Sequence, residues 1–276
     1  MVYDTLVISG GSTKAIIALG ALQYAYDAKL LENVKIYVGT SAGAMINYLL
    51  AIGYTPIEII VYICTYQILE KLQHFNIVAM INGSGASSFS EIHAQLEKMT
   101  ISKIGYLPTF KDLHEKYNKI LICSTHNLTE EKTEYLGPYT TPDLPCITAL
   151  RMTANLPLIF EKYKYGESFY IDGAVSDNFP IQIGDELGEK VLGILIGTEK
   201  SDFNDTKDSS ILEYIYKIMF IPISQAIEYK ISNCTENCNI IRLGYKNIKV
   251  FNFNINSTEK LEMFSMGYQQ GERQLS

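Results

Sequence analysis

The stretch VKIYVGTSAGAMINYLL, residues 34–50, decides the fold class of this chain. Val34 to Val38 form an apolar run typical of a buried strand, and Ala44 to Leu50 have the pattern of a helix. Between them, Gly39-Thr40-Ser41-Ala42-Gly43 places a small hydroxyl between two glycines. The glycines let the chain bend sharply without side-chain clashes, and the new helix directs backbone N–H groups toward Ser41. The spacing predicts a nucleophile elbow with an exposed Ser41.

Strand and helix patterns alternate on both sides of this elbow. Thr5 to Ser9 is predicted as a strand and Ala15 to Ala28 as a helix, so a strand–helix–strand–helix order opens the chain. Further strands are predicted at Lys119 to Ser124, Ser168 to Ile171, Lys190 to Ile196 and Asn239 to Leu243, and further helices at Ile57 to Leu72, Glu91 to Met99 and Ile211 to Ile231. Loops are predicted at Asn82 to Ser90 and Thr198 to Ser210. This order predicts an α/β fold with a parallel sheet.

Length and composition favour one domain and exclude one class of partner. A chain of 276 residues with 47% hydrophobic residues buries a large core, and this length fits a single α/β domain over residues 1–276. The net charge of −7 argues against nucleic acid as a partner, because phosphate binding depends on clustered Lys and Arg. Any membrane contact would depend on local apolar or basic patches. The sequence carries no indication of the oligomeric state.

The cysteines and the first residues indicate the cellular compartment. The five cysteines are odd in number and mostly in apolar surroundings, which is typical of free thiols in a reducing compartment. Cys234 and Cys238 are the only close pair, and two cysteines without two further ligands nearby do not complete a tetrahedral zinc site. The first residues lack a basic n-region, and polar residues and Pro56 interrupt the apolar stretch at 42–64. We expect a soluble, cytoplasmic protein without a bound metal ion.

The histidine positions exclude the usual partner of an elbow serine. In α/β-hydrolases the general base is a histidine that follows both the serine and the acidic residue. The histidines of this chain are His74, His93, His114 and His126. His126 is the best candidate among them, but a histidine at the exit of a strand more often has a structural role. The general base is therefore predicted to be a carboxylate.

Asp172 is the carboxylate that the pattern favours. The apolar strand Phe169-Tyr170-Ile171 ends directly before it, and Gly173-Ala174 then turns the chain. Gly173 leaves room for a nearby hydroxyl, and a carboxylate within hydrogen-bond reach of Ser41 takes its proton directly. Taken alone, the segment also fits a simple Asp-Gly turn between strand and loop.

A third segment offers a place for negative charge. Ser9-Gly10-Gly11-Ser12-Thr13-Lys14 lies where the first strand ends and the first helix begins. Small residues let a substrate carbonyl approach the backbone N–H groups, and a turn at a helix start favours developing negative charge. The segment lacks the spacing of a P-loop, so it fits an anion cradle or simple packing.

In their order and spacing, these segments resemble the motifs of the patatin-like phospholipases. The matching segments are Gly10-Gly11-Ser12-Thr13-Lys14-Ala15, Gly39-Thr40-Ser41-Ala42-Gly43 and Asp172-Gly173-Ala174. Leu150 to Phe160 is similar to the segment before the family's aspartate strand, Asp177 to Pro180 to its Asn-Pro stretch, and Leu261 to Gly267 to its last helix. The resemblance implies a three-layer α/β/α sandwich with a mainly parallel central sheet, the patatin-like fold similar to that of FabD and lysophospholipases.

The resemblance also implies a set of roles. Ser41 would be the nucleophile and Asp172 the base of a catalytic dyad. The oxyanion hole would be formed by Gly10, Gly11 and Ser12, with Lys14, Gly39, Gly43 and Gly173 in supporting positions. The expected activity is hydrolysis of fatty-acyl ester bonds in phospholipids or other lipids, of the phospholipase A type, through an acyl-enzyme. No cofactor and no catalytic metal ion are expected.

One departure from the family pattern concerns the oxyanion turn. The first motif of the family usually reads Gly-Gly-Gly-x-Arg/Lys-Gly, and this chain has Ser12 and Ala15 in place of two glycines. Either residue could shift the turn from a conformation that glycine favours. The alternative function is therefore a weakly active or inactive lipid-binding or regulatory protein on the same fold. A soluble carboxylesterase or thioesterase is a second alternative.

The apolar, Tyr-rich helix at Ile211 to Ile231 is the best candidate for a lipid-facing surface. Apolar helical stripes more often pack on a core, so packing against the sheet is the more common interpretation. Peripheral membrane contact remains an expectation that depends on which faces of this helix are exposed.

Overall fold

The computed structural model describes residues 2–69, 85–197, 211–245, 253 and 255–276. Its strands are β1 (Thr5–Ile8), β2 (Ile36–Thr40), β3 (Ile120–Asn127), β4 (Lys132–Leu136), β5 (Tyr163–Tyr165), β6 (Ser168–Asp172), β7 (Val191–Gly197) and β8 (Cys238–Gly244). Its helices are α1 (Ile16–Asp27), α2 (Ala42–Ala51), α3 (Pro56–Tyr66), α5 (Ser90–Ile104), α6 (Phe110–Tyr117), α7 (Cys146–Thr153), α8 (Ile181–Leu187), α9 (Ile211–Ser232) and α10 (Ser257–Leu275). Two short 3₁₀ helices are η1 (Ser12–Ala15) and η3 (Gly173–Val175).

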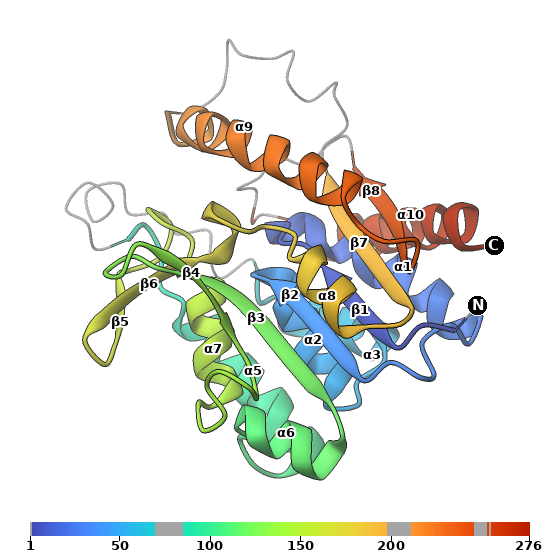
Figure 1. Cartoon of the computed structure of the whole chain (residues 1–276), viewed down its shortest axis with the longest axis horizontal. Coiled ribbons are helices and arrows are strands. Elements are labelled where there is room, and N and C mark those ends of the chain that lie inside the picture. Colours follow the sequence, from blue (N-terminus) through green and yellow to red (C-terminus); the bar gives the residue numbers. More distant parts are fainter. Residues whose placement is uncertain (1, 70–84, 198–210, 246–252, 254) are drawn as a thin grey trace.

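The strands form one mixed sheet in the order β5-β6-β3-β2-β1-β7-β8, with β4 also paired to β3. The run from β3 through β2, β1 and β7 to β8 is parallel. The strands β4, β5 and β6 are joined by antiparallel pairs. The mainly parallel sheet predicted from the strand–helix order is therefore confirmed. The antiparallel strands lie at one end of it (Figure 1).

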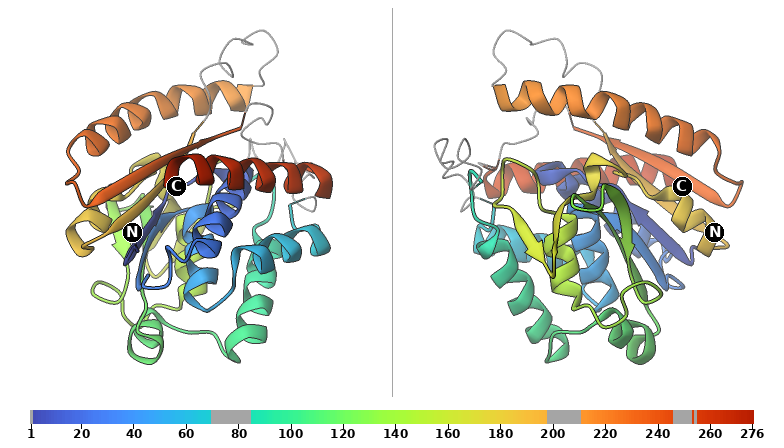
Figure 2. Two further views of the ribbon diagram at one scale, coloured as in Figure 1. Left: turned by 90° about the vertical axis from the view of Figure 1, so that its right-hand side faces the viewer. Right: turned by 60° about the vertical axis from the view of Figure 1, so that its left-hand side comes forward.

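Helices cover both faces of the sheet, because successive side chains of a strand point to opposite faces. In β1, Leu6 and Ile8 join the core cluster that contains α1, α2, α3, α7 and α10. Val7 joins the other cluster, which contains α8 and the inner face of α9. Figure 2 shows β7 and β8 between α9 on one side and α10 on the other. The structure thus has the predicted three layers.

Helices α1 and α10 pack at very short range because glycines line their contact. A Cβ added at Gly20 of α1 would lie 1.9 Å from the carbonyl oxygen of Phe264. A Cβ at Gly267 of α10 would lie 1.9 Å from the carbonyl oxygen of Ile17, and one at Gly271 would lie 2.8 Å from the Cα of Ala21. The two backbones are therefore closer than any larger side chain would permit.

Strand β2 is displaced relative to the sequence prediction, and the displacement concerns the elbow. The predicted strand Val34 to Val38 begins instead at Ile36 and continues to Thr40. Gly39 pairs with Ile8 of β1, and Thr40 pairs with Ser124 of β3. The sheet thus carries the chain up to the residue before Ser41.

Helix α3 is shorter than predicted, and two predicted loops are only partly described. The helix predicted at Ile57 to Leu72 begins at Pro56 and ends at Tyr66, because Gln67 has the left-handed conformation of a helix end. Residues 70–72 of that helix, residues 82–84 of one predicted loop and all of the loop at Thr198 to Ser210 lie outside the described residues. Over the described ranges, no helix alone is long and apolar enough to cross a membrane. Helices α2 and α3 pass that test only as a pair, which is bent by 120°.

Candidate active site

Ser41 is the single residue between the end of β2 and the start of α2, and its backbone conformation is strained. Its φ of 54° and ψ of −127° are torsions that residues with side chains rarely adopt. The flanking positions require glycine because no space is left for a Cβ atom. A Cβ at Gly39 would lie 2.8 Å from the nitrogen of Ala44, and one at Gly43 would lie 2.5 Å from the carbonyl oxygen of Ile8. The elbow is therefore packed tightly against α2 at Gly39 and against β1 at Gly43, and the chain makes the sharp bend that the glycine spacing predicted.

The Ser41 hydroxyl donates a hydrogen bond to the carboxylate of Asp172, with Oγ 2.6 Å from Oδ2. The other carboxylate oxygen, Oδ1, accepts the N–H of Ala174 at 2.8 Å. Asp172 is fully buried, and Ser41 is only 5% exposed. The prediction of an exposed serine is thus wrong, because the partners that hold it also cover it. The two residues singled out from the sequence are in direct contact.

Burial raises the pKa of Asp172 to about 7, although the hydrogen bonds from Ser41 and Ala174 act in the opposite direction. Burial removes water from the carboxylate and so disfavours its charged form, and none of the described cations contributes to the pKa of Asp172. A carboxyl group with a pKa near neutrality is both a competent proton acceptor and a competent proton donor near pH 7. The pair can therefore move a proton between Ser41 and Asp172 without a histidine.

Thr153, at the end of α7, holds the elbow in position. Its Oγ1 accepts the Ser41 N–H at 2.9 Å and donates to the Ser124 carbonyl of β3 at 2.5 Å. The Asp172 N–H donates to the carbonyl of Asn155, two residues beyond α7, at 2.9 Å. One helix end thus fixes both members of the pair. Thr153 lies in the segment Leu150 to Phe160 that resembles the family, but the sequence analysis assigned it no role of its own.

Position 173 requires glycine because the neighbouring backbone leaves no space for a side chain. A Cβ there would lie 2.2 Å from the carbonyl oxygen of Ser124, the same oxygen that accepts the Thr153 hydroxyl. A larger residue would push η3 away from β3 and displace Asp172. Gly173 therefore allows the close packing of η3 against β3 that positions Asp172.

The turn at Gly10 to Ser12 lies beside the serine. A Cβ at Gly10 would be 3.3 Å from the Cβ of Ser41 and 2.4 Å from the Oδ1 of Asn178. The Gly10 N–H donates to the carbonyl of Asn178 at 3.1 Å, so this N–H is already used within the fold. Lys14 is buried in η1. Gly11 and Ser12 stand at the start of η1, where backbone N–H groups have no partner within the helix.

The two departures from the family motif differ in their conformations. Ser12 has a φ of 50°, in the left-handed region that favours glycine. Ala15 has a φ of −60°, an ordinary helical value, so glycine has no conformational advantage there. The predicted shift away from the glycine conformation has not occurred at Ser12. The serine instead adopts that conformation, at a cost of about 1–2 kcal/mol.

We expect the Ser12→Gly variant to be more stable than the parent protein by about 1 kcal/mol. It removes the left-handed strain and a hydroxyl that has no partner among the described residues, and these gains exceed the entropic cost of glycine. Thermal unfolding measures the difference. Ser12→Val is the matched control, because a β-branched residue fits this conformation least and should lower both stability and activity. Equal stability of all three proteins would contradict the strain at Ser12.

The segment after Asp172 links the turn to the sheet and to α9. Asp177 is 4% exposed, and its backbone carbonyl accepts the hydroxyl of Thr40 at 2.9 Å. Its carboxylate accepts the Tyr135 hydroxyl at 2.7 Å and lies 2.7 Å from the Nζ of Lys230 on α9. The next residue, Asn178, holds Gly10. Helix α9 is therefore connected to the turn at Gly10 to Ser12 through two consecutive residues.

Helix α9 also lies near Asp172 itself. Tyr216 is 3% exposed, and its hydroxyl donates to the Pro157 carbonyl at 2.5 Å. Burial, and to a smaller extent the charge of Asp172, raises the pKa of Tyr216. The N-terminal half of α9 thus forms part of the cover over the Ser41–Asp172 pair.

His126 does not take part in the pair. It lies on β3 opposite Ile171, and its Nδ1 is buried without a hydrogen-bond partner among the described residues. The Ser41 hydroxyl donates to Asp172 and not to a histidine. The sequence-based choice of a carboxylate over a histidine agrees with this arrangement.

Comparison with known proteins identifies similar chains. A family model described as patatin-like phospholipase matches residues 6–185. The chain is 37% identical over 188 residues to the probable lipid hydrolase 463L of Invertebrate iridescent virus 6, and the match covers 66% of this chain and 63% of that protein. It is 24% identical over 280 residues to the uncharacterized protein R571 of Acanthamoeba polyphaga mimivirus, covering 98% of this chain and 93% of that protein.

Two solved structures share the fold. VipD from Legionella pneumophila superposes with a TM-score of 0.60 at 17% identity, over 99% of this chain and 66% of that one. ExoU, in its complex with SpcU from Pseudomonas aeruginosa, superposes with a TM-score of 0.50 at 15% identity, over 98% of this chain and 51% of that one. At these identities the likeness concerns the fold alone. The chain spans less than two thirds of the length of 463L and of VipD.

Proposed function

The chain belongs to the patatin-like phospholipase family, and from this membership we propose that it is a lipid acyl hydrolase of the phospholipase A type. The observation that carries the proposal is the hydrogen bond of 2.6 Å between the strained Ser41 and the buried carboxylate of Asp172. The name of the viral relative 463L, a probable lipid hydrolase, supports the same class of reaction.

In the proposed mechanism, Asp172 removes the proton of Ser41 as the Oγ attacks the carbonyl carbon of a lipid ester. The oxyanion that forms is stabilised by the N–H groups of Gly11 and Ser12, since that of Gly10 is held by Asn178. Asp172 then returns the proton to the leaving alcohol, and an acyl-Ser41 ester remains. A water molecule then gives a proton to Asp172 and attacks this ester, and Asp172 passes that proton to the Ser41 Oγ as the fatty acid leaves, which restores the free enzyme.

The test compares three kinds of substrate with one protein preparation. We expect fatty-acid release from mixed phospholipid vesicles, and covalent labelling by a fluorophosphonate probe at the peptide that contains Ser41. Faster turnover of acyl-CoA or of a water-soluble ester than of vesicles would instead indicate a soluble thioesterase or carboxylesterase. Saturable vesicle binding without labelling or release would indicate a lipid-binding protein and would overturn the proposal.

We further propose that the outer face of α9 contacts the lipid surface. The described exposed residues of its N-terminal half are apolar and recur at helical spacing: Tyr214, Ile215, Ile218, Ile221 and Pro222. The opposite stripe, which includes Tyr216 and Ile223, is buried over the site. The inner face of such a helix packs on the protein, and an outer face that is also apolar is stabilised by contact with a second apolar surface. Lipid fits this position, because the half of α9 with the apolar outer face is the half that lies over Asp172.

The remainder of α9 supports this division. Beyond Ile223 its exposed residues are Ser224, Gln225, Ala226, Glu228, Tyr229 and Ser232. Glu228 forms a bidentate pair with Arg242 of β8, at 2.7 and 2.8 Å. The C-terminal half is thus mainly polar outside, with Tyr229 as an exposed aromatic residue, and it is anchored by charge pairs. Most of the large exposed apolar side chains of α9 therefore lie in the half near Asp172.

We expect Ile218→Asp to lower fatty-acid release from vesicles by about tenfold or more, because burying one isoleucine side chain is worth about 1.5–3 kcal/mol. Hydrolysis of a water-soluble ester should change less than about twofold, since the substitution leaves the dyad intact. Gln225→Asp is the matched control, with the same added charge on an exposed position of the same helix. Equal losses on both substrates, or in both variants, would contradict a membrane-contacting role for this face.

A further inference from the structure

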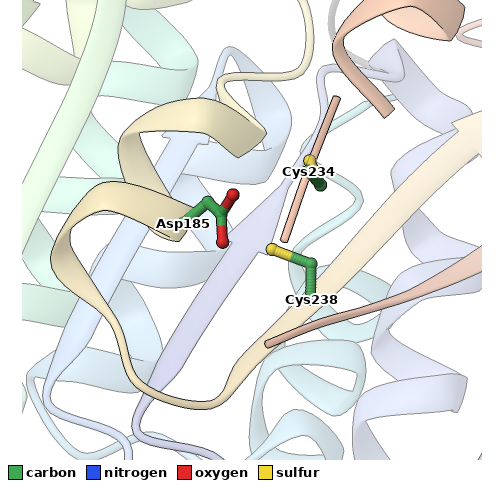
Figure 3. A group of neighbouring side chains, drawn as sticks. All are labelled: Asp185, Cys234 and Cys238. Carbon is green, nitrogen blue, oxygen red and sulfur yellow. The ribbon is translucent and has the colours of Figure 1, made fainter. Parts of the chain in front are cut away.

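A cluster remote from the sequence motifs brings together two thiols and a carboxylate. Cys234 follows the end of α9, Cys238 begins β8, and Asp185 lies on α8. Figure 3 shows the three side chains directed toward a common space. The two Sγ atoms and a carboxylate oxygen all lie within 4.8 Å of one another, and each residue is half-buried. The sequence supplied only the two cysteines, because Asp185 reaches them through the fold.

The turn between the two cysteines is held in place by Asp185 itself. The carboxylate accepts the N–H of Thr235 at 2.9 Å and also accepts its hydroxyl. The Cys238 N–H donates to the Thr235 carbonyl at 3.2 Å, which closes the turn. Hydrogen bonds of this kind orient a carboxylate that binds a metal ion while leaving lone pairs for coordination. The three side chains are therefore arranged before any ion arrives.

We propose that Asp185, Cys234 and Cys238 bind one zinc ion, with water completing its coordination. Zn–S bonds of about 2.3 Å in a tetrahedral site place two sulfurs roughly 3.8 Å apart, so contraction of the cluster by about 1 Å or less is sufficient. Two thiolates select a thiophilic cation over magnesium or calcium. Binding releases the two thiol protons to solvent and involves no change of oxidation state.

The consequence of binding is structural. The ion ties α8 to the turn between α9 and β8, and so fixes the C-terminal end of the helix that covers the dyad. In the last turn of α9, Lys230 pairs with Asp177, whose neighbour Asn178 holds Gly10. The zinc site therefore supports the anchored end of α9 and takes no part in ester hydrolysis. The proposal is independent of the proposed function.

The test uses the full chain, freed of metal by a chelator and kept reduced by a phosphine. Cobalt(II) is the spectroscopic probe, because thiolate ligation gives charge-transfer absorption and a tetrahedral site gives intense visible bands. We expect saturation at one cobalt ion per chain and loss of the bands on addition of zinc. Zinc should also raise the melting temperature. Fatty-acid release should be the same with and without the chelator.

Single variants identify the ligands. Cys234→Ser and Cys238→Ser should lose the charge-transfer absorption, and Asp185→Asn should weaken binding by about tenfold or more. Cys64→Ser, a half-buried cysteine on α3, is the control and should bind as the parent does. If Cys238→Ser fails to fold, the other two variants still decide the question. The proposal would be overturned if neither cobalt nor zinc bound saturably. It would also be overturned if binding survived in the variant that carries both Cys234→Ser and Cys238→Ser.

Discussion

Replacing Ser41 with alanine is expected to lower kcat for fatty-acid release by on the order of 10⁶-fold, the size of effect found when a serine hydrolase loses its nucleophile. The physical reason is that no other described side chain donates a hydrogen bond to Asp172; the carboxylate's second contact is the backbone N–H of Ala174. The measurement is the rate of fatty-acid release from mixed phospholipid vesicles, with labelling by a fluorophosphonate probe in parallel.

The control for this variant is its folded state. Alanine has nearly the same difficulty with the φ of 54° as serine has, so the thermal unfolding temperature should remain close to that of the parent. Intact-mass spectrometry should detect an acylated species only in the parent protein. Parental rates of release by a folded Ser41→Ala protein would show that another residue attacks the ester.

Replacing Asp172 with asparagine is expected to have opposite effects on activity and on stability. Activity should fall by on the order of 10⁴-fold, because an amide does not accept the Ser41 proton. In the parent protein, kcat/KM should rise with pH and reach half of its maximum near pH 7, the pKa of the buried carboxyl. This pH dependence, measured on a soluble ester, should disappear from the residual activity of the variant.

The effect on stability follows from the direction of the pKa shift. The pKa of Asp172 is about 7 in the folded protein, above its value of 3.8 in the unfolded chain. The parent therefore keeps the full contribution of the protonated group below about pH 4 and loses it as pH rises through 7. An asparagine has nothing to ionise, so the variant gains stability relative to the parent across that window, by on the order of 4 kcal/mol at most.

Urea unfolding of both proteins at pH 4, 6 and 8 measures this difference. The gain should be absent at pH 4 and largest at pH 8. Ser41→Ala is the matched control, since it removes the hydrogen-bonded partner but keeps the ionisable group. A difference between parent and Asp172→Asn that is constant with pH would mean that the carboxyl is not buried as described.

The pair Ser41–Asp172 was predictable from sequence because each residue stands at the end of an apolar strand with a glycine beside it. Strand ends of a sheet place side chains at a common edge, and local spacing is enough to recognise them. The serine's burial was not predictable, since it depends on Thr153, which lies 112 positions away. Threonine has many uses in proteins, so its type alone carried no signal.

Long-range hydrogen bonds also determine which backbone N–H groups of the turn at Gly10 to Ser12 are used within the fold, and the sequence did not indicate these bonds. The Gly10 N–H donates to the carbonyl of Asn178, 168 positions away, so we propose only Gly11 and Ser12, of the three predicted donors, for the oxyanion. Short elements such as α6, α8, β4 and β5 were not predicted, because their hydrophobic patterns span too few residues to distinguish them from loops. Asp185 reached the cysteine pair through one of these short elements.

The glycine contact between α1 and α10 has a consequence for the order of events during synthesis. Helix α1 leaves the ribosome early, but Gly267 and Gly271, against which its backbone packs, follow about 250 residues later. No other described element contacts α1 as extensively as α10 does. The layer that contains α1 is therefore completed only after α10 has emerged, because the close backbone contact at Ile17 and Ala21 forms with Gly267 and Gly271.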